Sequence, residues 1–278
     1  MLNFVVGIDL GGTLLRAALI DSEGYIHSKT SLATASKKGS QEIINQICKL
    51  TSIVSKSISK DQILGIGISS PGPLNSKKGL ILTAPTLVGF KNIPLVKILE
   101  ERLKLPVFLE NDAIAAAIGE HRFGAGQGFK NLVYITVSTG IGGGVIIDGK
   151  VLYGFMGMAG HVGHMTIIRN GDKCSCGNQG CWEAYGSGAA LTKRAKKYLD
   201  TGIKSMISNY SKIDGAAVFD SAKKGDKLAL QIVFEESEIL GLGITNLLHL
   251  YSPEIIILGG GVSNGFDLLI PGINYYIK

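Results

Sequence analysis

Two stretches of the chain share one pattern of apolar and polar positions. In each, an apolar run, a turn rich in glycine, a second apolar run and a closing aspartate follow one another, at 4–21 and again at 132–149. Apolar runs of this length bounded by glycine turns predict β-hairpins. Because the pattern occurs twice, we expect an internal duplication, with two related halves of the chain.

The segments around these hairpins alternate between helical and strand-like spacing. Apolar positions predict helices at 41–59, 95–104, 113–123, 188–199 and 226–250, and buried strands at 63–69, 107–109 and 254–258. This alternation predicts an α/β protein with layers of sheet and helix. We place the domain division after residue 112, so that 1–112 form a small α/β domain and 113–278 a large one.

Composition excludes several classes of function. The 278 residues are 45% hydrophobic and 18% charged, which is typical of a well-packed globular protein, and 38 of them are glycine. No apolar run reaches the length of a membrane span and no signal peptide precedes the first strand, so we expect a cytoplasmic protein. The net charge of +6 comes from scattered lysines, which favours small anionic ligands over nucleic acid.

The glycine turns of the two hairpins are candidate phosphate loops. A dinucleotide-binding loop opens a helix, whereas each of these turns leads into a second strand, which excludes a Rossmann motif. Backbone N–H groups at two such turns can instead hold a triphosphate, with Asp9 facing Mg²⁺. An ordinary tight hairpin is the alternative for either turn alone. Similarly, the glycines 259–261 either admit an adenine or its ribose or form a simple turn.

Polar residues at two predicted strand ends are candidates for substrate contacts. Asn111 and Asp112 follow one strand and precede a helix, so either residue suits the helix N-cap. Asp112 also suits a general base that takes the proton of a hydroxyl attacking phosphorus. The stretch 69–73, SSPGP, is either a rigid turn or a wall for a small polar ligand.

Three of the four cysteines lie close together, after a histidine. His164 precedes Cys174 by ten residues, and Cys176 and Cys181 follow at intervals of two and five. One imidazole and three thiolates complete a tetrahedral Zn²⁺ site without an open position, so such a zinc is structural rather than catalytic. A disulfide with one free thiol, or a redox pair, is the alternative.

Together, these motifs resemble those of the ROK family of sugar kinases and repressors, within the actin-like (ribonuclease H-like) ATPase fold. The matching motifs are DLGGT at 9–13, LENDA at 109–113, STGIGGG at 138–144, AGHVGH at 159–164, CSCGNQGC at 174–181 with Glu183 following, and LGGG at 258–261. The resemblance implies two α/β domains around a cleft. It also implies ATP-dependent phosphorylation of a hexose, most simply at the 6-hydroxyl of glucose, with N-acetylglucosamine, N-acetylmannosamine and fructose as alternatives.

The resemblance further implies roles for individual residues, with Asp112 as the catalytic base. The sugar-contacting residues are Asn111, Asp112, His161, His164 and Glu183. Ser70 and Gly72, from the stretch 69–73, are further candidates for sugar contacts. The residues for ATP and Mg²⁺ are Asp9, Gly11, Gly12, Thr13, Thr139, Gly140, Gly142 and Gly260. The ligands of the structural Zn²⁺ are His164, Cys174, Cys176 and Cys181.

The sequence departs from the family pattern at three places. His161 stands where many members carry a glutamate that contacts the sugar, which leaves the choice of sugar open. Ile114 replaces a common asparagine and either loses a polar contact or packs in the core. The chain ends at Lys278, where members usually continue into a helix that closes the first domain.

Two further expectations follow from the resemblance. Similar kinases are often dimers, so we expect a homodimer. Sugar-sensing regulators of the same family are the alternative from another class of function. Such regulators carry a DNA-binding segment before the first strand, which the sequence does not show.

Overall fold

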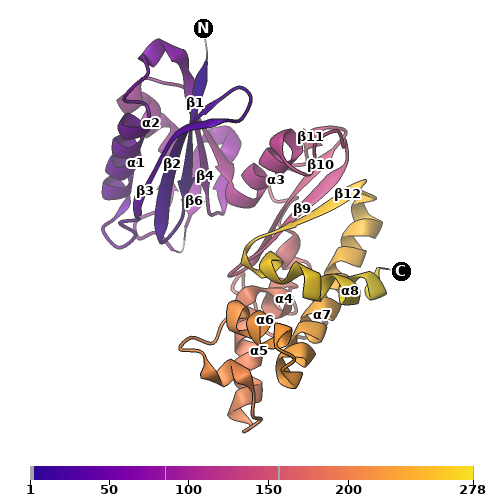
Figure 1. The fold of residues 1–278 in the computed structure, drawn as a ribbon. Helices are drawn as coiled ribbons and strands as arrows, with labels where there is room; N and C mark the ends of the chain where they lie inside the picture. The colour runs from indigo at the N-terminus through magenta and orange to yellow at the C-terminus, as the bar shows by residue number, and fades with distance from the viewer. Residues whose placement is uncertain (1–2, 85, 156, 278) are drawn as a thin grey trace. The chain divides into compact units, whose positions relative to one another are not determined.

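The chain divides into two α/β units, each with its own sheet and hydrophobic core (Figure 1). The computed structural model describes residues 3–84, 86–155 and 157–277. The first unit takes in Met1–Ala115 and Phe155–Gly157, and the second Ala116–Gly154 and Met158–Lys278. The division in the continuous chain falls within helix α3 (Asp112–Phe123).

The first unit is built on a five-stranded sheet of order β3-β2-β1-β4-β8. Its strands are β1 (Phe4–Leu10), β2 (Leu14–Asp21), β3 (Ile26–Ala33), β4 (Ile63–Ser70) and β8 (Val107–Asn111). The first three form an antiparallel meander, β4 runs parallel to β1, and β8 runs parallel to β4. A second, three-stranded sheet of order β5-β6-β7 joins β5 (Leu74–Asn75), β6 (Leu80–Thr83) and β7 (Lys91–Ile93).

Helices α1 (Ser40–Val54) and α2 (Leu95–Leu103) pack against the sheet of the first unit. Ile43, Ile47 and Leu50 of α1 and Leu99 of α2 are buried in its core. The predicted helix at 41–59 therefore ends earlier than expected, at Val54. The polar run Ser55–Ser57 provides no apolar side chain to continue the buried stripe of α1.

The second unit repeats part of this topology in a four-stranded sheet of order β11-β10-β9-β12. Its strands are β9 (Leu132–Val137), β10 (Ile141–Ile147), β11 (Lys150–Val151) and β12 (Ile255–Gly259). β9 pairs antiparallel with β10 and parallel with β12, just as β1 pairs antiparallel with β2 and parallel with β4. This shared arrangement confirms the duplication that the hairpin pattern predicts.

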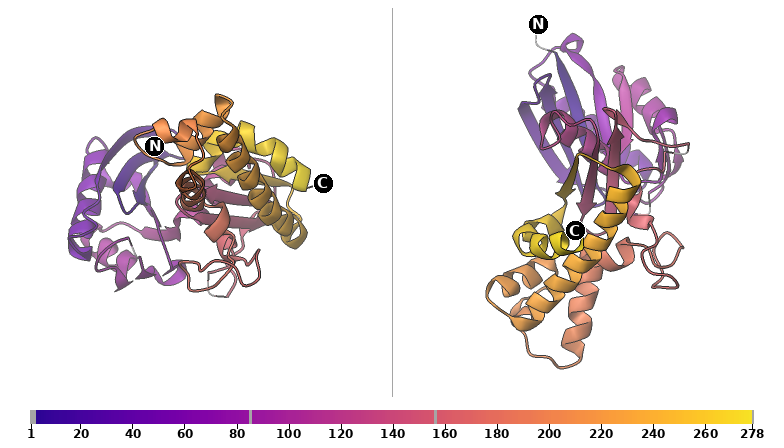
Figure 2. Two further views of the ribbon diagram at one scale, coloured as in Figure 1. Left: turned by 90° about the horizontal axis from the view of Figure 1, so that it is seen from below. Right: turned by 90° about the vertical axis from the view of Figure 1, so that its right-hand side faces the viewer.

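The helices of the second unit follow the sheet's hairpin in the chain. They are α4 (Glu183–Gly186), α5 (Gly188–Asp200), α6 (Gly215–Lys223), α7 (Lys227–Tyr251) and α8 (Phe266–Tyr276). α7 begins after Asp226, whose carboxylate accepts a hydrogen bond from the Ala229 N–H, and it lies alongside α8 (Figure 2). None of the described helices is both long enough and apolar enough to cross a membrane.

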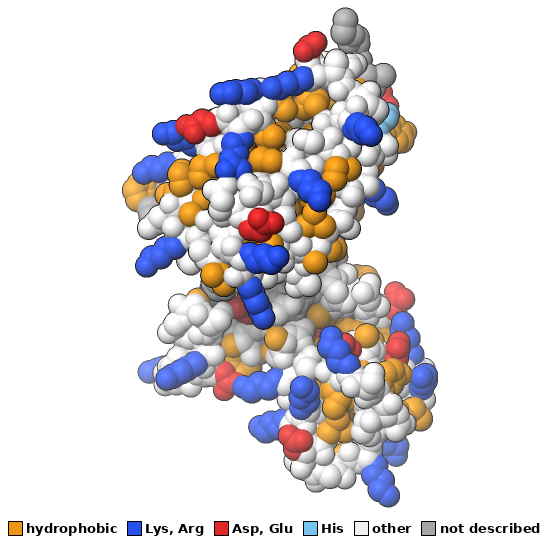
Figure 3. Space-filling model, turned by 90° about the vertical axis from the view of Figure 1, so that its left-hand side faces the viewer, with side chains coloured by type: hydrophobic (Ala, Val, Ile, Leu, Met, Phe, Trp, Pro, Cys, Tyr) orange, Lys and Arg blue, Asp and Glu red, His pale blue; other side chains and the backbone are white. Residues whose placement is uncertain are grey.

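The charge on one face of the molecule is dispersed. On the face drawn in Figure 3, Lys and Arg side chains are scattered and Asp and Glu side chains lie among them. This face carries no dense basic patch of the kind that binds a nucleic-acid backbone.

Candidate functional site

In the first unit, the β1–β2 hairpin holds Asp9 between two neighbours. The sheet register sets Asp9 opposite Arg16 of β2 and Ser69 of β4. Arg16 Nη1 donates to Asp9 Oδ2 at 2.6 Å, and Ser69 Oγ donates to Oδ1 at 3.1 Å. The Asp9 side chain is still 44% exposed, so its carboxylate is open to solvent and to a cation. The motifs do not point to Arg16, although its position follows from counting across the hairpin turn, whereas Ser69 lies in the stretch 69–73 named above.

The turn of this hairpin is tightly packed around its glycines. A Cβ at Gly12 would lie 2.8 Å from the Cβ of Thr86, closer than side-chain atoms approach. Thr34 fixes the turn by donating its N–H to the Thr13 carbonyl and its hydroxyl to the Gly11 carbonyl, at 2.9 and 2.7 Å. Close packing therefore explains why position 12 of the DLGGT motif is a glycine, whatever ligand the turn binds.

Strand β8 ends and helix α3 begins at the two residues predicted to meet the substrate. Asn111 Oδ1 accepts the N–H groups of Ala113 and Ile114, at 3.0 and 3.3 Å, which makes Asn111 the N-cap. Asp112 Oδ1 shares the Ala113 N–H at 2.8 Å. Burial by the surrounding protein raises the pKa of Asp112 and the charge of Asp9 adds to the rise, although the Ala113 N–H opposes it. A raised pKa makes the carboxylate a stronger base.

The end of β4 lies beside the end of β8. Ser70 pairs in register with Asn111, and a Cβ added at Gly72 would lie 3.6 Å from Asn111 Nδ2. Ser70 is fully buried and donates its hydroxyl to the Pro71 carbonyl at 3.1 Å, so it serves the turn internally. Ile114, where the sequence departs from the family pattern, is also buried, so its side chain packs in the core.

In the second unit, the four predicted metal ligands come together. His164 ends the short helix η3 (Val162–His164), and its ligand atom and the three sulfur atoms all lie within 4.8 Å of one another. Cys174 Sγ lies 3.7 Å from His164 Nδ1, and Cys176 Sγ lies 3.7 Å from Cys181 Sγ.

These spacings fit a metal site and differ from those of a closed disulfide. Thiolates bound to a tetrahedral zinc at about 2.3 Å are about 3.8 Å apart, whereas the two sulfur atoms of a disulfide are about 2.05 Å apart. All four cysteines of the chain are free. The cluster therefore has the donor atoms and the spacing of a closed four-ligand metal site.

The protonation of the cluster depends on its surroundings. Burial raises the pKa of the Cys181 thiol to about 12, whereas the backbone N–H of Asn178 lowers that of Cys176. The half-buried ring of His161 stacks on His164, with ring centres 6.4 Å apart. Burial, and then the charge of His164, lower the pKa of His161, which favours a neutral ring at pH 7.

Glu183, which follows the last cysteine, reaches the β9–β10 hairpin. Its Oε2 accepts the N–H of Ile141 at 3.0 Å, and a Cβ on Gly140 would overlap with the same oxygen. Its Oε1 accepts the hydroxyl of Ser175, in the cysteine loop, at 3.2 Å. Glu183 thus connects the group of four predicted ligands, called the metal cluster below, to the turn that carries Thr139 and Gly140. The sequence motifs do not predict this connection.

Two other segments hold the same turn. The Gly188 N–H at the start of α5 donates to the Ser138 carbonyl at 2.7 Å. Gly260, after β12, has a φ of 87° and approaches the Val137 carbonyl so closely that a Cβ would overlap with it. A side chain at position 260 is therefore excluded by both conformation and space.

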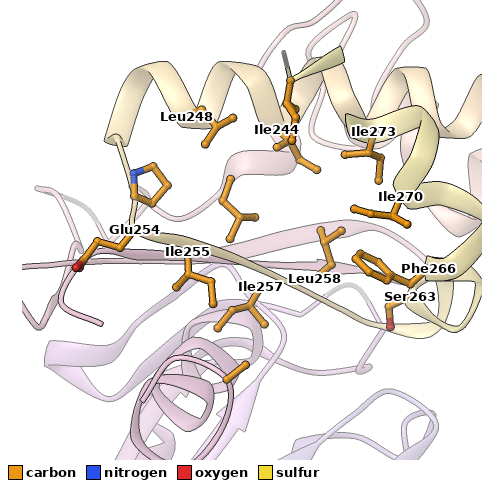
Figure 4. Close-up of a pocket in the computed structure, with 14 residues that line it drawn as sticks. Ile244, Leu248, Glu254, Ile255, Ile257, Leu258, Ser263, Phe266, Ile270 and Ile273 are labelled. Carbon is orange, nitrogen blue, oxygen red and sulfur yellow. The ribbon is translucent and has the colours of Figure 1, made fainter. Parts of the chain in front are cut away.

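A large apolar pocket in the second unit lies elsewhere. Its volume is 540 Å³, and aliphatic and aromatic side chains of α7, β12 and α8 line it (Figure 4): Ile244, Leu248, Ile255, Ile256, Ile257, Leu258, Phe266, Ile270 and Ile273. Among the described residues that line it, none belongs to the predicted sites. Its apolar wall suits neither a sugar nor a phosphate, which need hydrogen-bonding groups.

Comparison with known proteins gives consistent matches along the chain. Residues 5–278 match the ROK family. The glucokinase of Thermotoga maritima is 35% identical over 269 residues, which span 95% of this chain and 84% of that protein. The crystal structure of a ROK family glucokinase from Streptomyces griseus in complex with glucose and AMPPNP has a TM-score of 0.84 and 35% identity, covering 99% of this chain and 88% of that one. The xylose repressor of Caldicellulosiruptor bescii is 34% identical over 282 residues, 99% of this chain and 70% of that protein.

The duplicated sheets, each with a glycine hairpin, define a protein of the actin-like ATPase fold. The chain belongs to the ROK family. Within the first unit, the structure brings Asp9 near Asp112 and Gly72 near Asn111. Within the second, it brings the four predicted metal ligands together and joins Glu183 to the β9–β10 turn.

Proposed function

We propose that this protein is a sugar kinase that transfers the γ-phosphate of ATP to a hexose hydroxyl, most simply the 6-hydroxyl of glucose. The proposal rests on Asp112, which follows the end of a strand. Its carboxylate has a raised pKa, and the negative charge of Asp9 contributes to the rise. The glucokinase of Thermotoga maritima, and that of Streptomyces griseus with glucose and AMPPNP bound, support the activity and both substrates.

Asp112 acts as the general base in this reaction. The sugar hydroxyl oxygen forms a bond to the γ-phosphorus, the bond from that phosphorus to the bridging oxygen breaks, and ADP leaves with the electron pair. The hydroxyl proton passes to the Asp112 carboxylate, whose raised pKa favours its acceptance.

The proposed sugar contacts begin with the hydrogen-bonding groups beside the base. Asn111 uses its oxygen as the α3 cap, which orients its Nδ2 beside Gly72 as a donor for a sugar hydroxyl. His161, His164 and Glu183 supply the remaining sugar contacts. His164 turns Nδ1 toward the cysteines, so its Nε2 is the nitrogen left for the sugar.

The two glycine hairpins bind the phosphates of ATP. Gly11, Gly12 and Thr13 form the first turn, and Thr139, Gly140 and Gly142 belong to the second, with Gly260 beside the nucleoside. Asp9 would hold Mg²⁺, which would offset the phosphate charge. Arg16 and Ser69 each hydrogen-bond one Asp9 oxygen, so the positive charge of Arg16 would compete with the ion.

The four-ligand cluster holds a structural zinc ion. One imidazole and three thiolates fill a tetrahedral coordination shell, so the ion has no open position for substrate. We further propose that the protein forms a homodimer, which light scattering after size exclusion would test.

The experiment that tests the function is a sugar panel. Purified protein with ATP and Mg²⁺ receives glucose, mannose, fructose, N-acetylglucosamine or N-acetylmannosamine, and ADP release is followed. We expect turnover with at least one sugar, highest with glucose, and none above background with Asp112→Asn. The similarity to a xylose repressor favours a sugar-sensing regulator as the second candidate. Sugar binding without ADP release by the wild-type protein, together with specific DNA retention, would establish that candidate instead.

A further inference from the structure

Three consecutive residues connect the metal cluster to the protein core and to the β9–β10 turn. Cys181 is a ligand of the cluster and Glu183 accepts the Ile141 N–H. Between them, Trp182 is fully buried and donates its indole N–H to the Ile239 carbonyl at 2.9 Å. Gly243 of α7 makes room for the indole, because a Cβ there would overlap with the ring. The tripeptide is therefore anchored between the ligand and the turn.

The other end of the cluster reaches the same residue, Ile141. Gly163, beside the ligand His164, packs so closely on the carbonyl of Ile141 that a Cβ would overlap with it. The backbone N–H of Trp182 donates to the carbonyl of Met165 at 2.9 Å, which ties the histidine segment to the cysteine segment. Gly163, next to His164, and Glu183, two residues after Cys181, thus contact the carbonyl and the N–H of one residue, Ile141.

The Ile141 contacts leave part of the turn available for a ligand. Ser138 donates its N–H to the Gly140 carbonyl across the turn. The N–H groups of Thr139 and Gly140 make no hydrogen bond to any residue in the described part of the chain. Holding Ile141 from both sides restricts the movement of these two neighbouring groups, and consecutive free backbone N–H groups can bind an anion.

We propose that the metal cluster braces the second phosphate turn through Glu183 and Gly163, so that metal occupancy sets the affinity for the nucleotide. Glu183 is then a positioning residue for the turn, in addition to any contact with the sugar. The inference rests on the proposed function only in naming a nucleoside triphosphate as the ligand of the turn.

The test compares the wild-type protein with Glu183→Ala, each as the full chain, before and after metal removal. No sugar is added. Hydrogen exchange of 138–144 and the dissociation constant for AMPPNP are measured with zinc bound and after chelation, with zinc content confirmed in each sample. We expect chelation to speed exchange in the turn and to weaken AMPPNP binding about tenfold, the effect of losing one charge-assisted hydrogen bond. Zinc-loaded Glu183→Ala should show both changes already, and chelation should then add little.

Matched variants separate a bracing role from a general loss of structure. Glu183→Gln retains an oxygen that can accept the Ile141 N–H, so it should recover part of the affinity. Asp200→Asn removes a charge from an exposed position of α5 and should behave as wild type. If Glu183→Ala does not fold, Gly163→Ala tests the other contact and should loosen the turn with zinc bound.

Two results would overturn the proposal. One is unchanged exchange and unchanged AMPPNP affinity in the wild type after verified loss of zinc. The other is an equal effect of chelation in the wild type and in Glu183→Ala, since the two changes would then act independently. If the zinc-loaded wild type binds no AMPPNP, the proposed function is wrong, while the exchange data still decide whether the cluster braces the turn.

Discussion

Arg194→Met should destabilise the second unit strongly at pH 8 and only weakly at pH 5. Arg194 of α5 pairs with the fully buried carboxylate of Glu236 on α7, and the arginine side chain is only 16% exposed. Burial raises the pKa of Glu236 to about 7 even though Arg194 opposes the rise. Without the guanidinium, the folded chain has to bury an unpaired carboxylate or take up a proton.

The direction of the pH dependence follows from the raised pKa of Glu236. Since the folded state holds the Glu236 proton more tightly than the unfolded chain, the contribution of Glu236 to the free energy of unfolding is highest below pH 4.5. It falls as the pH rises from 4.5 to about 7, by about 3 kcal/mol at 1.36 kcal/mol per pH unit. Removing Arg194 should lower it by a further ~3–5 kcal/mol at pH 8, where the carboxylate is charged. At pH 5 the acid is neutral, and the loss should be about 1 kcal/mol.

Urea unfolding followed by circular dichroism at both pH values measures these differences. The double variant Arg194→Met/Glu236→Leu removes both charges and should recover most of the stability at pH 8. Glu235 also lies near Arg194 but is 24% exposed and accepts the Tyr198 hydroxyl, so it should contribute less. Equal destabilisation by Arg194→Met at pH 5 and pH 8, or no recovery in the double variant, would refute the reasoning.

Three other substitutions, with Gly119→Ala as a control, test the site and the core. Asp112→Asn should lower kcat by about 10²–10⁴-fold with sugar binding retained. In the wild type, kcat should fall as the pH drops below the raised pKa of Asp112. A rate of ADP release that does not change with pH would argue against Asp112 as the base. Gly243→Ala should cost about 1–3 kcal/mol by crowding Trp182, whereas Gly119→Ala, with open space at its Cβ, should not lower the Tm. Cys176→Ser should reduce bound zinc measured by atomic emission, and one full equivalent retained would contradict the ligand set.

Local patterns predict the hairpins and the metal cluster because the information lies within short stretches of the chain. Apolar alternation selects strands, and the glycines mark the turns between them. The spacing of Cys174, Cys176 and Cys181 confines three ligands to one loop, so only His164 has to be brought to them by the fold. In contrast, the two-residue strand β5 is too short to carry a periodic signal.

Long-range contacts could not be predicted in the same way. The bond between Glu183 and the Ile141 N–H joins residues 42 positions apart, and no spacing rule connects them. Ser70 is the opposite case. From the sequence, a serine in a Pro-Gly turn suits the wall of a ligand site, and only the structure shows that its side chain is completely buried. Tertiary packing decides both outcomes, because it determines which polar groups meet one another and which meet solvent.

The Asn111 side chain divides its amide between two tasks. Its oxygen caps α3, while its nitrogen is directed to the side of the turn where Gly72 lies. Aspartate at this position would preserve the cap but could not donate, and alanine would lose both functions. Asn111→Asp should therefore retain the thermal stability of the first unit and lose sugar affinity. If Asn111 binds the sugar as proposed, helix stability and substrate recognition constrain position 111 jointly, and a change in sugar preference is easier to achieve at neighbouring positions that carry only one of these roles.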